Sequence, residues 1–304
     1  MSEQAWRDFY FHTRDGLKLY VRDYGDRTAR ATPLLCLAGL TRNSRDFHDI
    51  ALHLSTAAKT PRRVVCLDYR GRGKSAWDKN WRNYSPLVEA QDVFDLMAAA
   101  GLDHVAILGT SRGGIIAMIM GVMRPAQIAG VALNDVGPKL GAKGLARIKG
   151  YVGRTAAPAS WRDAVRLIKS MNEGQFTALD EDGWMDFARR TFEERKGKLV
   201  LSYDPALSKP LEELDLGERM PTLWPQFHTL KHARLMVLRG EHSDLLTVDT
   251  VDAMRHDRPD MVSITVPGEG HAPLLRDEAT IRAIEKFLET VDNPPKKLSA
   301  SGAG

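Results

Sequence analysis

The sequence predicts an α/β fold in which a parallel sheet carries helices on both faces and is interrupted by an inserted helical cap. Short apolar runs of strand length alternate with helical patterns over residues 1–138, and again over residues 233–292. This alternation is typical of parallel sheets, because each crossover between parallel strands usually carries a helix. Residues 139–232 break the rhythm with helical patterns and almost no strand signal, which predicts the cap.

Turn and capping residues delimit the elements in order. Asp15-Gly16 separates two short apolar stretches and predicts a hairpin. A helix is predicted to begin at Ser85-Pro86 and to end at Gly101, and Ser160 is the predicted N-cap of a helix in the inserted segment. The predicted strands are 9–11, 17–21, 34–37, 64–67, 105–108, 131–133, 235–238 and 262–266. The tail over residues 293–304 is rich in proline, lysine, serine and glycine, and we expect it to be disordered.

Composition and charge exclude several classes of protein. The chain has 304 residues, 43% of them hydrophobic, with a formal net charge of +4 and basic residues scattered along it. This pattern gives little support to nucleic-acid binding. No apolar run approaches the length of a membrane span, and residues 1–11 lack a signal-peptide pattern. We therefore expect a soluble, cytoplasmic protein with a small-molecule partner and no nucleic-acid or membrane partner. The sequence does not determine its oligomeric state.

The two cysteines, Cys36 and Cys66, each lie inside a predicted strand. Buried free thiols are favoured there over a disulfide. Two cysteines cannot form a zinc-type cluster, so we predict no metal site.

Ser111 lies in the motif Gly109-Thr110-Ser111-Arg112-Gly113, between an apolar strand pattern and an apolar helix pattern. A G-x-S-x-G at a strand-to-helix turn is typical of the nucleophile elbow of serine hydrolases. The glycines are required because larger side chains would collide with the crossing strand and helix. The sequence therefore predicts that Ser111 is a nucleophile.

A serine nucleophile needs a base and an acid that orients the base. Among nine histidines, His271 follows the last predicted strand within a glycine-rich loop, so we predict that it is the base. Two carboxylates compete for the role of the acid. We prefer Asp244, in the loop after strand 235–238, and keep Asp135, after strand 131–133, as the alternative.

An oxyanion hole requires two backbone donors near the nucleophile. The amide of Arg112, the residue after Ser111, is the first candidate. The second is the amide of Leu40, in the loop after strand 34–37, where Gly39 permits a tight turn. The stretch from Asp68 to Ser75 resembles a phosphate loop but lacks its glycine spacing, so we interpret it as a structural turn.

Together these residues resemble the α/β-hydrolase family over about residues 9–291. The resemblance rests on Gly39, the D-Y-R-G-R-G-K-S stretch of residues 68–75, the Ser111 elbow, Asp244 and Gly270-His271, in this order. It implies an eight-stranded, mostly parallel sheet, a cap inserted after the sixth strand, and no organic cofactor or metal.

The resemblance also narrows the chemistry. Serine at position 111 argues against the haloalkane dehalogenases and epoxide hydrolases of that family, which use aspartate there. We expect a serine hydrolase that cleaves a carboxylic ester or lactone of a small, fairly apolar substrate through an acyl-enzyme. A carbon–carbon bond hydrolase or perhydrolase with the same triad is the alternative, although Ala272, rather than tryptophan, follows His271. A non-catalytic small-molecule receptor is the alternative from another class.

Overall fold

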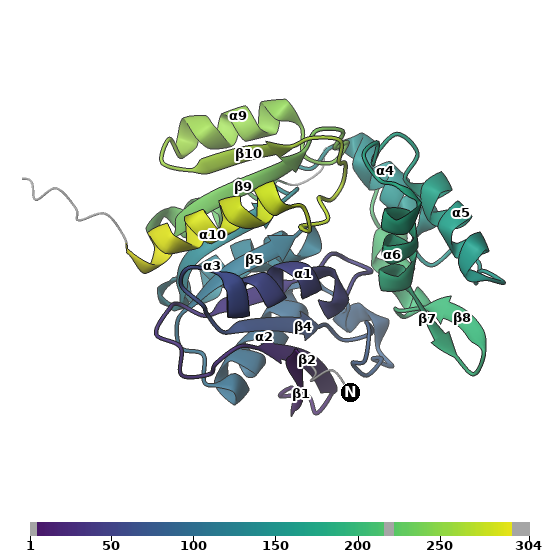
Figure 1. Ribbon diagram of the computed structural model, residues 1–304, viewed down its shortest axis with the longest axis horizontal. Coiled ribbons are helices and arrows are strands. Elements are labelled where there is room, and N and C mark those ends of the chain that lie inside the picture. Colours follow the sequence, from purple (N-terminus) through teal and green to yellow (C-terminus); the bar gives the residue numbers. More distant parts are fainter. Residues whose placement is uncertain (1–4, 216–221, 294–304) are drawn as a thin grey trace, which may run out of the picture.

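The computed structural model describes residues 5–215 and 222–293 (Figure 1). Within these residues, eight strands form one sheet in the order β1-β2-β4-β3-β5-β6-β9-β10. These strands are β1 (Trp6–His12), β2 (Lys18–Tyr24), β3 (Leu34–Leu37), β4 (Val64–Asp68), β5 (Val105–Thr110), β6 (Ile128–Asn134), β9 (Arg234–Gly240) and β10 (Val262–Val266). β2 runs antiparallel to both β1 and β4, and the other neighbours are parallel. The predicted eight-stranded, mostly parallel sheet is confirmed.

Helices cover the sheet on two sides. The longer core helices are α2 (Pro86–Ala100), α3 (Arg112–Met123), α9 (Val248–Asp257) and α10 (Glu278–Asp292), with the short α1 (His48–Leu52). Figure 1 shows α1 and α10 together in front of the sheet, and a hydrogen bond of 2.8 Å joins His53, just after α1, to Glu285 of α10. Ser85 caps α2 and Gly101 ends it in a left-handed conformation, as the sequence predicts.

The centre of the sheet is apolar on both faces. All four residues of β3 and all five of β4 are buried. Such continuous burial explains why these strands read as unbroken apolar runs rather than as alternating patterns. Cys36 and Cys66 lie side by side in this pair of strands and are buried free thiols, as predicted.

A second layer lies beside the sheet and contains the predicted cap helices. These elements are α4 (Ala142–Tyr151), α5 (Trp161–Met171), α6 (Glu181–Thr191) and α7 (Lys209–Glu212), and Figure 1 shows α4, α5 and α6 at one end of the molecule. α5 and α6 share an apolar cluster of their own that includes Ile168 and Trp184. A helical inserted unit is therefore present.

The inserted segment differs from the prediction in two places. It contains an antiparallel hairpin of β7 (Phe192–Arg195) and β8 (Lys198–Leu201), joined by Lys196 and Gly197, which both have positive φ. In addition, α8 (Trp224–His228) packs with the main core: Phe227 and Leu230 belong to the core cluster. A Cβ at Gly121 of α3 would lie 2.6 Å from Leu230 Cδ2. The segment predicted as cap, which ends at residue 232, thus includes α8 and Leu230, which pack with the core.

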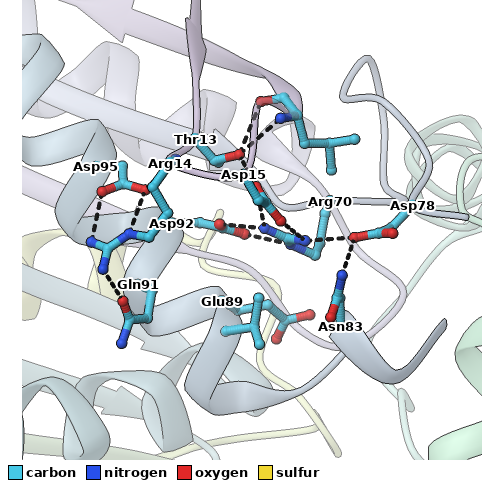
Figure 2. A network of polar contacts seen from close by, with 12 residues as sticks. Thr13, Arg14, Asp15, Arg70, Asp78, Asn83, Glu89, Gln91, Asp92 and Asp95 are labelled. Carbon is cyan, nitrogen blue, oxygen red and sulfur yellow. Dashed lines mark hydrogen bonds and ion pairs between the residues drawn. The ribbon is translucent and has the colours of Figure 1, made fainter. Parts of the chain in front are cut away.

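A buried charge network fixes the turn that follows β4 (Figure 2). The Arg70 guanidinium makes two hydrogen bonds to Asp92 of α2, at 2.6 and 2.7 Å, and reaches Asp78 at 2.6 Å and Asp15 at 3.0 Å. It therefore ties the β1–β2 turn and the loop after β4 to α2. This supports the interpretation of residues 68–75 as a structural turn.

The remaining elements are short helical turns, and the tail lies outside the described residues. The turns are η1 (Ser44–Phe47), η2 (His53–Ala57), η3 (Trp81–Asn83), η4 (Pro125–Gln127), η5 (Pro205–Ser208) and η6 (Thr229–His232). Among the residues that the structure describes, none of the helices combines the length and apolarity needed to cross a bilayer. The predicted disorder of 293–304 concerns, apart from Asn293, residues that are not described.

Candidate active site

Ser111 lies at the sharp turn between β5 and α3. Its backbone has a φ of 51° and a ψ of −111°, a positive-φ conformation that is strained for a residue with a side chain. A Cβ at Gly113 would lie 2.0 Å from the carbonyl oxygen of Leu37, and a Cβ at Gly109 would lie 2.7 Å from the Gly113 backbone. Both glycines are thus sterically required, as the elbow motif predicts.

The structure brings Ser111 and His271 together. The Oγ atom of Ser111 lies 2.9 Å from Nε2 of His271, within hydrogen-bond distance. His271 belongs to the loop between β10 and α10, and its side chain is almost fully buried. The contact joins positions 160 residues apart in sequence. This is the geometry in which an imidazole takes the proton from an attacking hydroxyl.

The carboxylate that contacts His271 is Asp135. Its Oδ2 lies 2.7 Å from Nδ1 of His271 and also accepts a hydrogen bond of 2.5 Å from Ser243 Oγ. Its Oδ1 accepts the amide of Gly240 at 2.8 Å. Asp135 is completely buried, so these three hydrogen bonds replace the water that its charge has lost.

The prediction that Asp244 orients His271 is wrong. Asp244 instead makes a two-pronged ion pair with Arg147 of α4, at 2.8 and 2.9 Å. Burial raises the pKa of a carboxyl group, but Arg147 outweighs it, so the pKa of Asp244 lies below its ordinary value of 3.8. Asp244 thus joins the inserted unit to the sheet, and the alternative acid, Asp135, takes the position beside the histidine.

Sheet order explains this outcome. β6 is the direct neighbour of β5, so Asp135, the first residue after β6, lies next to the strand that carries Ser111. The amide of Asp135 also donates to the carbonyl of Leu238 in β9, which keeps the residue at the sheet edge. Asp244 lies four residues beyond the end of β9, where the cap supplies a cationic partner.

The two predicted oxyanion donors flank Ser111. Leu40 lines the same pocket as Ser111 and His271, and a Cβ at Gly39 would lie 3.9 Å from Ser111 Cβ. Arg112 is the first residue of α3, where backbone amides have no carbonyl partner within their own helix. The assignment of the Leu40 and Arg112 amides as oxyanion donors stays a prediction.

Two residues that the sequence did not single out hold the histidine loop. Gln175, between α5 and α6, accepts the amide of His271 at 3.0 Å and donates to the carbonyl of His242 at 3.2 Å. Asn134, the last residue of β6, donates to the carbonyl of Pro273 at 2.9 Å. Asn134 could have been found from the sequence, because a polar residue at the end of an apolar strand stands out. Gln175 could not, because it lies in a loop whose sequence has no periodic pattern.

The pocket above Ser111 is lined by both the sheet loops and the inserted unit. Part of its wall is apolar, with Ile148, Ile168 and Phe187. Another part is charged and includes Arg42, Asp46, Asp186, Arg190 and Arg276. Within the described residues, no group of three or more histidine, cysteine or acidic side chains is arranged to hold a metal ion.

The chain is similar in sequence to known hydrolases. A family model described as "Alpha/beta hydrolase family" matches residues 34–283. The 3-hydroxybutyrate-oligomer hydrolase of Cupriavidus necator is 30% identical over 280 residues, which cover 89% of this chain and 92% of that protein. The 2-(acetamidomethylene)succinate hydrolase of Mesorhizobium japonicum is 22% identical over 258 residues, covering 84% and 87%.

Solved structures show the same architecture. An alpha/beta hydrolase from Novosphingobium aromaticivorans superimposes with a TM-score of 0.87 at 36% identity, covering 95% of this chain and 99% of that one. A crystal structure of E-2-(acetamidomethylene)succinate hydrolase superimposes with a TM-score of 0.77 at 20% identity, covering 93% and 99%. The second likeness concerns the fold alone.

Proposed function

Because this chain belongs to the alpha/beta hydrolase family, we propose that it is a serine hydrolase that cleaves a carboxylic ester through an acyl-enzyme. The observation that carries the proposal is the chain of contacts from Ser111 to His271 at 2.9 Å and from His271 to Asp135 at 2.7 Å. A buried carboxylate, an imidazole and a hydroxyl in this order form the catalytic arrangement of acyl transfer.

The mechanism follows from the positions of these atoms. Ser111 Oγ attacks the ester carbonyl carbon while its proton passes to Nε2 of His271, and Asp135 stabilises the imidazolium. The amides of Leu40 and Arg112 bind the oxyanion. The carbon–oxygen bond to the alcohol then breaks as His271 returns the proton to the leaving oxygen. A water molecule, deprotonated by His271, attacks the acyl-enzyme and releases the acid and free Ser111.

The pocket wall supports a substrate that carries a carboxylate. Arg42 is held by two hydrogen bonds to Asp46, at 2.6 and 2.7 Å, and Arg190 lies 2.8 Å from Asp186. Arg276, in contrast, meets Asp186 through a single nitrogen at 3.2 Å, and its other guanidinium nitrogens make no further hydrogen bond among the described residues. A guanidinium with free N–H groups fits a carboxylate in a two-pronged pair.

We therefore propose a short oligoester of a hydroxy acid with a free carboxylate end as the substrate class. Such a chain presents ester bonds and small alkyl groups to the apolar wall and its acid to Arg276. The printed name of the Cupriavidus necator relative, a hydrolase of 3-hydroxybutyrate oligomers, supports this class. The expected apolar character would then apply to the alkyl groups of the substrate but not to its terminal carboxylate.

The first experiment establishes ester hydrolysis. Hydrolysis of p-nitrophenyl esters from acetate to dodecanoate, with a small lactone panel, is compared for the wild type and Ser111→Ala. Turnover that needs Ser111 is the expected result. If the wild type hydrolyses none of the esters or lactones, ester hydrolysis is contradicted. A meta-cleavage diketone would then test for carbon–carbon bond cleavage. Binding without turnover would indicate a receptor.

The second experiment tests the carboxylate. We expect the free acid of a 3-hydroxybutyrate trimer to be cleaved with a kcat/KM at least tenfold above that of its methyl ester, since a charge-assisted hydrogen bond contributes about 1.5–3 kcal/mol. Arg276→Gln should remove the preference. Arg282→Gln, on an exposed part of α10, is the matched control and should retain it. Equal kcat/KM values in the wild type would contradict the carboxylate site.

A further inference from the structure

We propose that Glu89 is a positioning residue for catalysis, whose buried carboxylate holds, through Arg72 and Arg112, the two backbone amides of the oxyanion hole. The inference rests on the proposed function, since it needs an oxyanion to form above Ser111. Glu89 lies in the first turn of α2, and neither Glu89 nor Arg72 has any exposed side-chain surface.

The carboxylate of Glu89 gives one oxygen to each arginine. Its Oε1 lies 2.7 Å from Nη1 of Arg72, and its Oε2 lies 2.7 Å from Nε of Arg112. Burial raises the pKa of a carboxyl group, but Arg112 and Arg72 outweigh it and hold the pKa of Glu89 below its ordinary value of 4.5. The group is therefore ionised near neutral pH and bridges two cations.

The first arm reaches the loop after β3. Nε of Arg72 donates to the carbonyl oxygen of Leu40 at 2.8 Å, and Nη1 also donates to the carbonyl of Arg70 at 2.7 Å. On the other side of Leu40, the carbonyl of Gly39 accepts the amide of Arg42 at 3.1 Å. The Gly39 carbonyl and the Leu40 amide belong to one planar peptide unit. The direction of the Leu40 amide is therefore fixed from both sides.

The second arm reaches the nucleophile elbow. Besides its pair with Glu89, the Arg112 side chain donates from Nη2 to the carbonyl of Tyr84 at 2.9 Å. These contacts fasten the first residue of α3 to the start of α2. The amide of Arg112 belongs to the peptide unit that follows Ser111, so this anchor also limits movement of the strained turn.

Charge adds to the geometric effect. Two guanidinium groups and one carboxylate leave a net charge of +1 beside the proposed oxyanion hole, with Glu89 and Arg72 fully buried and Arg112 partly exposed. Positive charge in a medium that water does not reach stabilises a developing oxyanion more strongly than in solution. Apolar side chains of similar volume would fill this space without the cost of desolvating three charges. In their place, these charged groups supply a hydrogen bond between Glu89 and Arg112, two hydrogen bonds from Arg72 to backbone carbonyls, and a fixed charge. The contact between Glu89 and Arg72 is an ion pair.

The test uses Glu89→Gln, with Asp92→Asn as the matched control. Like Glu89, Asp92 is a buried carboxylate of α2, but it binds Arg70 instead (Figure 2). For Glu89→Gln we expect kcat on p-nitrophenyl acetate to fall about 10- to 100-fold, because a misplaced donor weakens the oxyanion hole. KM should change less than threefold. A trifluoromethyl ketone, which forms a tetrahedral hemiketal with the serine, should bind more weakly by the same factor as kcat. Asp92→Asn should lose stability but keep kcat within threefold.

Opposite results overturn the inference. A kcat within threefold of the wild type in Glu89→Gln, or an equal loss of kcat in Asp92→Asn, would show that Glu89 only stabilises the fold. If Glu89→Gln does not fold, Arg112→Gln replaces it, since this variant keeps the Glu89–Arg72 pair. It should lower kcat at least fivefold with KM unchanged, and an unchanged kcat would contradict the proposal.

The two proposals fail in different ways. If the wild type shows Ser111-dependent turnover and Glu89→Gln matches it, the positioning role alone is wrong. If the wild type hydrolyses none of the esters but reacts with a fluorophosphonate at Ser111, the rate of that reaction replaces kcat in the comparison of variants. If the wild type shows neither reaction, the proposed function is overturned, and the role of Glu89 with it.

Discussion

Oδ2 of Asp135 lies 2.7 Å from Nδ1 of His271, on the side of the imidazole that faces away from Ser111. A carboxylate in this position selects the tautomer whose Nε2 can accept the serine proton. Asp135→Asn places an amide there and favours the wrong tautomer, so we expect kcat on p-nitrophenyl acetate to fall about 10⁴-fold. Asp244→Asn is the control and should keep kcat within tenfold. A larger loss in Asp244→Asn would restore Asp244 as the acid.

Asp244 should matter for stability instead. Its pair with Arg147 lowers the pKa of Asp244 in the folded protein, despite burial. A lowered pKa means that its stabilisation is complete above the unfolded value of 3.8 and is lost as the pH falls through the folded value. Asp244→Asn should therefore lower the free energy of unfolding by about 2 kcal/mol at pH 7. Urea unfolding should show this difference constant from pH 7 to pH 5 and narrowing below 3.8. A difference that does not narrow would contradict the ionic origin.

Arg70 should contribute more to stability than any exposed arginine near it. Arg70→Met would leave Asp92 buried with no cation and would release Asp15 and Asp78 (Figure 2). Breaking a buried pair in this way costs about 3–5 kcal/mol. Arg14→Met removes a half-exposed pair with Asp95 and should cost about 1 kcal/mol or less. Equal losses for the two variants in urea unfolding would contradict the structural role of the turn after β4.

Local signals were sufficient for most of the sheet. β3 is found at residues 34–37, as predicted, because its four buried residues form a short apolar run between Pro33 and the turn residue Gly39. The Ser111 elbow was readable for a similar reason, since the strained turn and its close contacts require glycines at 109 and 113. The hairpin of β7 and β8 was missed because the charged sequence from Glu193 to Lys198 hides any alternation.

Contacts between distant segments were harder to predict. The choice between Asp135 and Asp244 depends on which strand lies beside β5 and on whether Arg147 occupies one of the two carboxylates, and neither fact is local. The same holds for Glu89, which reads as an ordinary acidic residue in the first turn of a helix. Its meaning depends on two arginines, one 17 residues before it and the other 23 residues after it in the numbering of the chain.

The most direct test of the central claim is the intact mass of the protein after reaction with a fluorophosphonate, followed by peptide mapping. The account predicts one phosphonyl group per chain, located on Ser111, and no labelling of Ser111→Ala. Asp135→Asn should label far more slowly than the wild type, because the base is misoriented. A wild-type protein that stays unlabelled, or one that is labelled elsewhere while Ser111→Ala reacts equally well, would contradict Ser111 as the nucleophile.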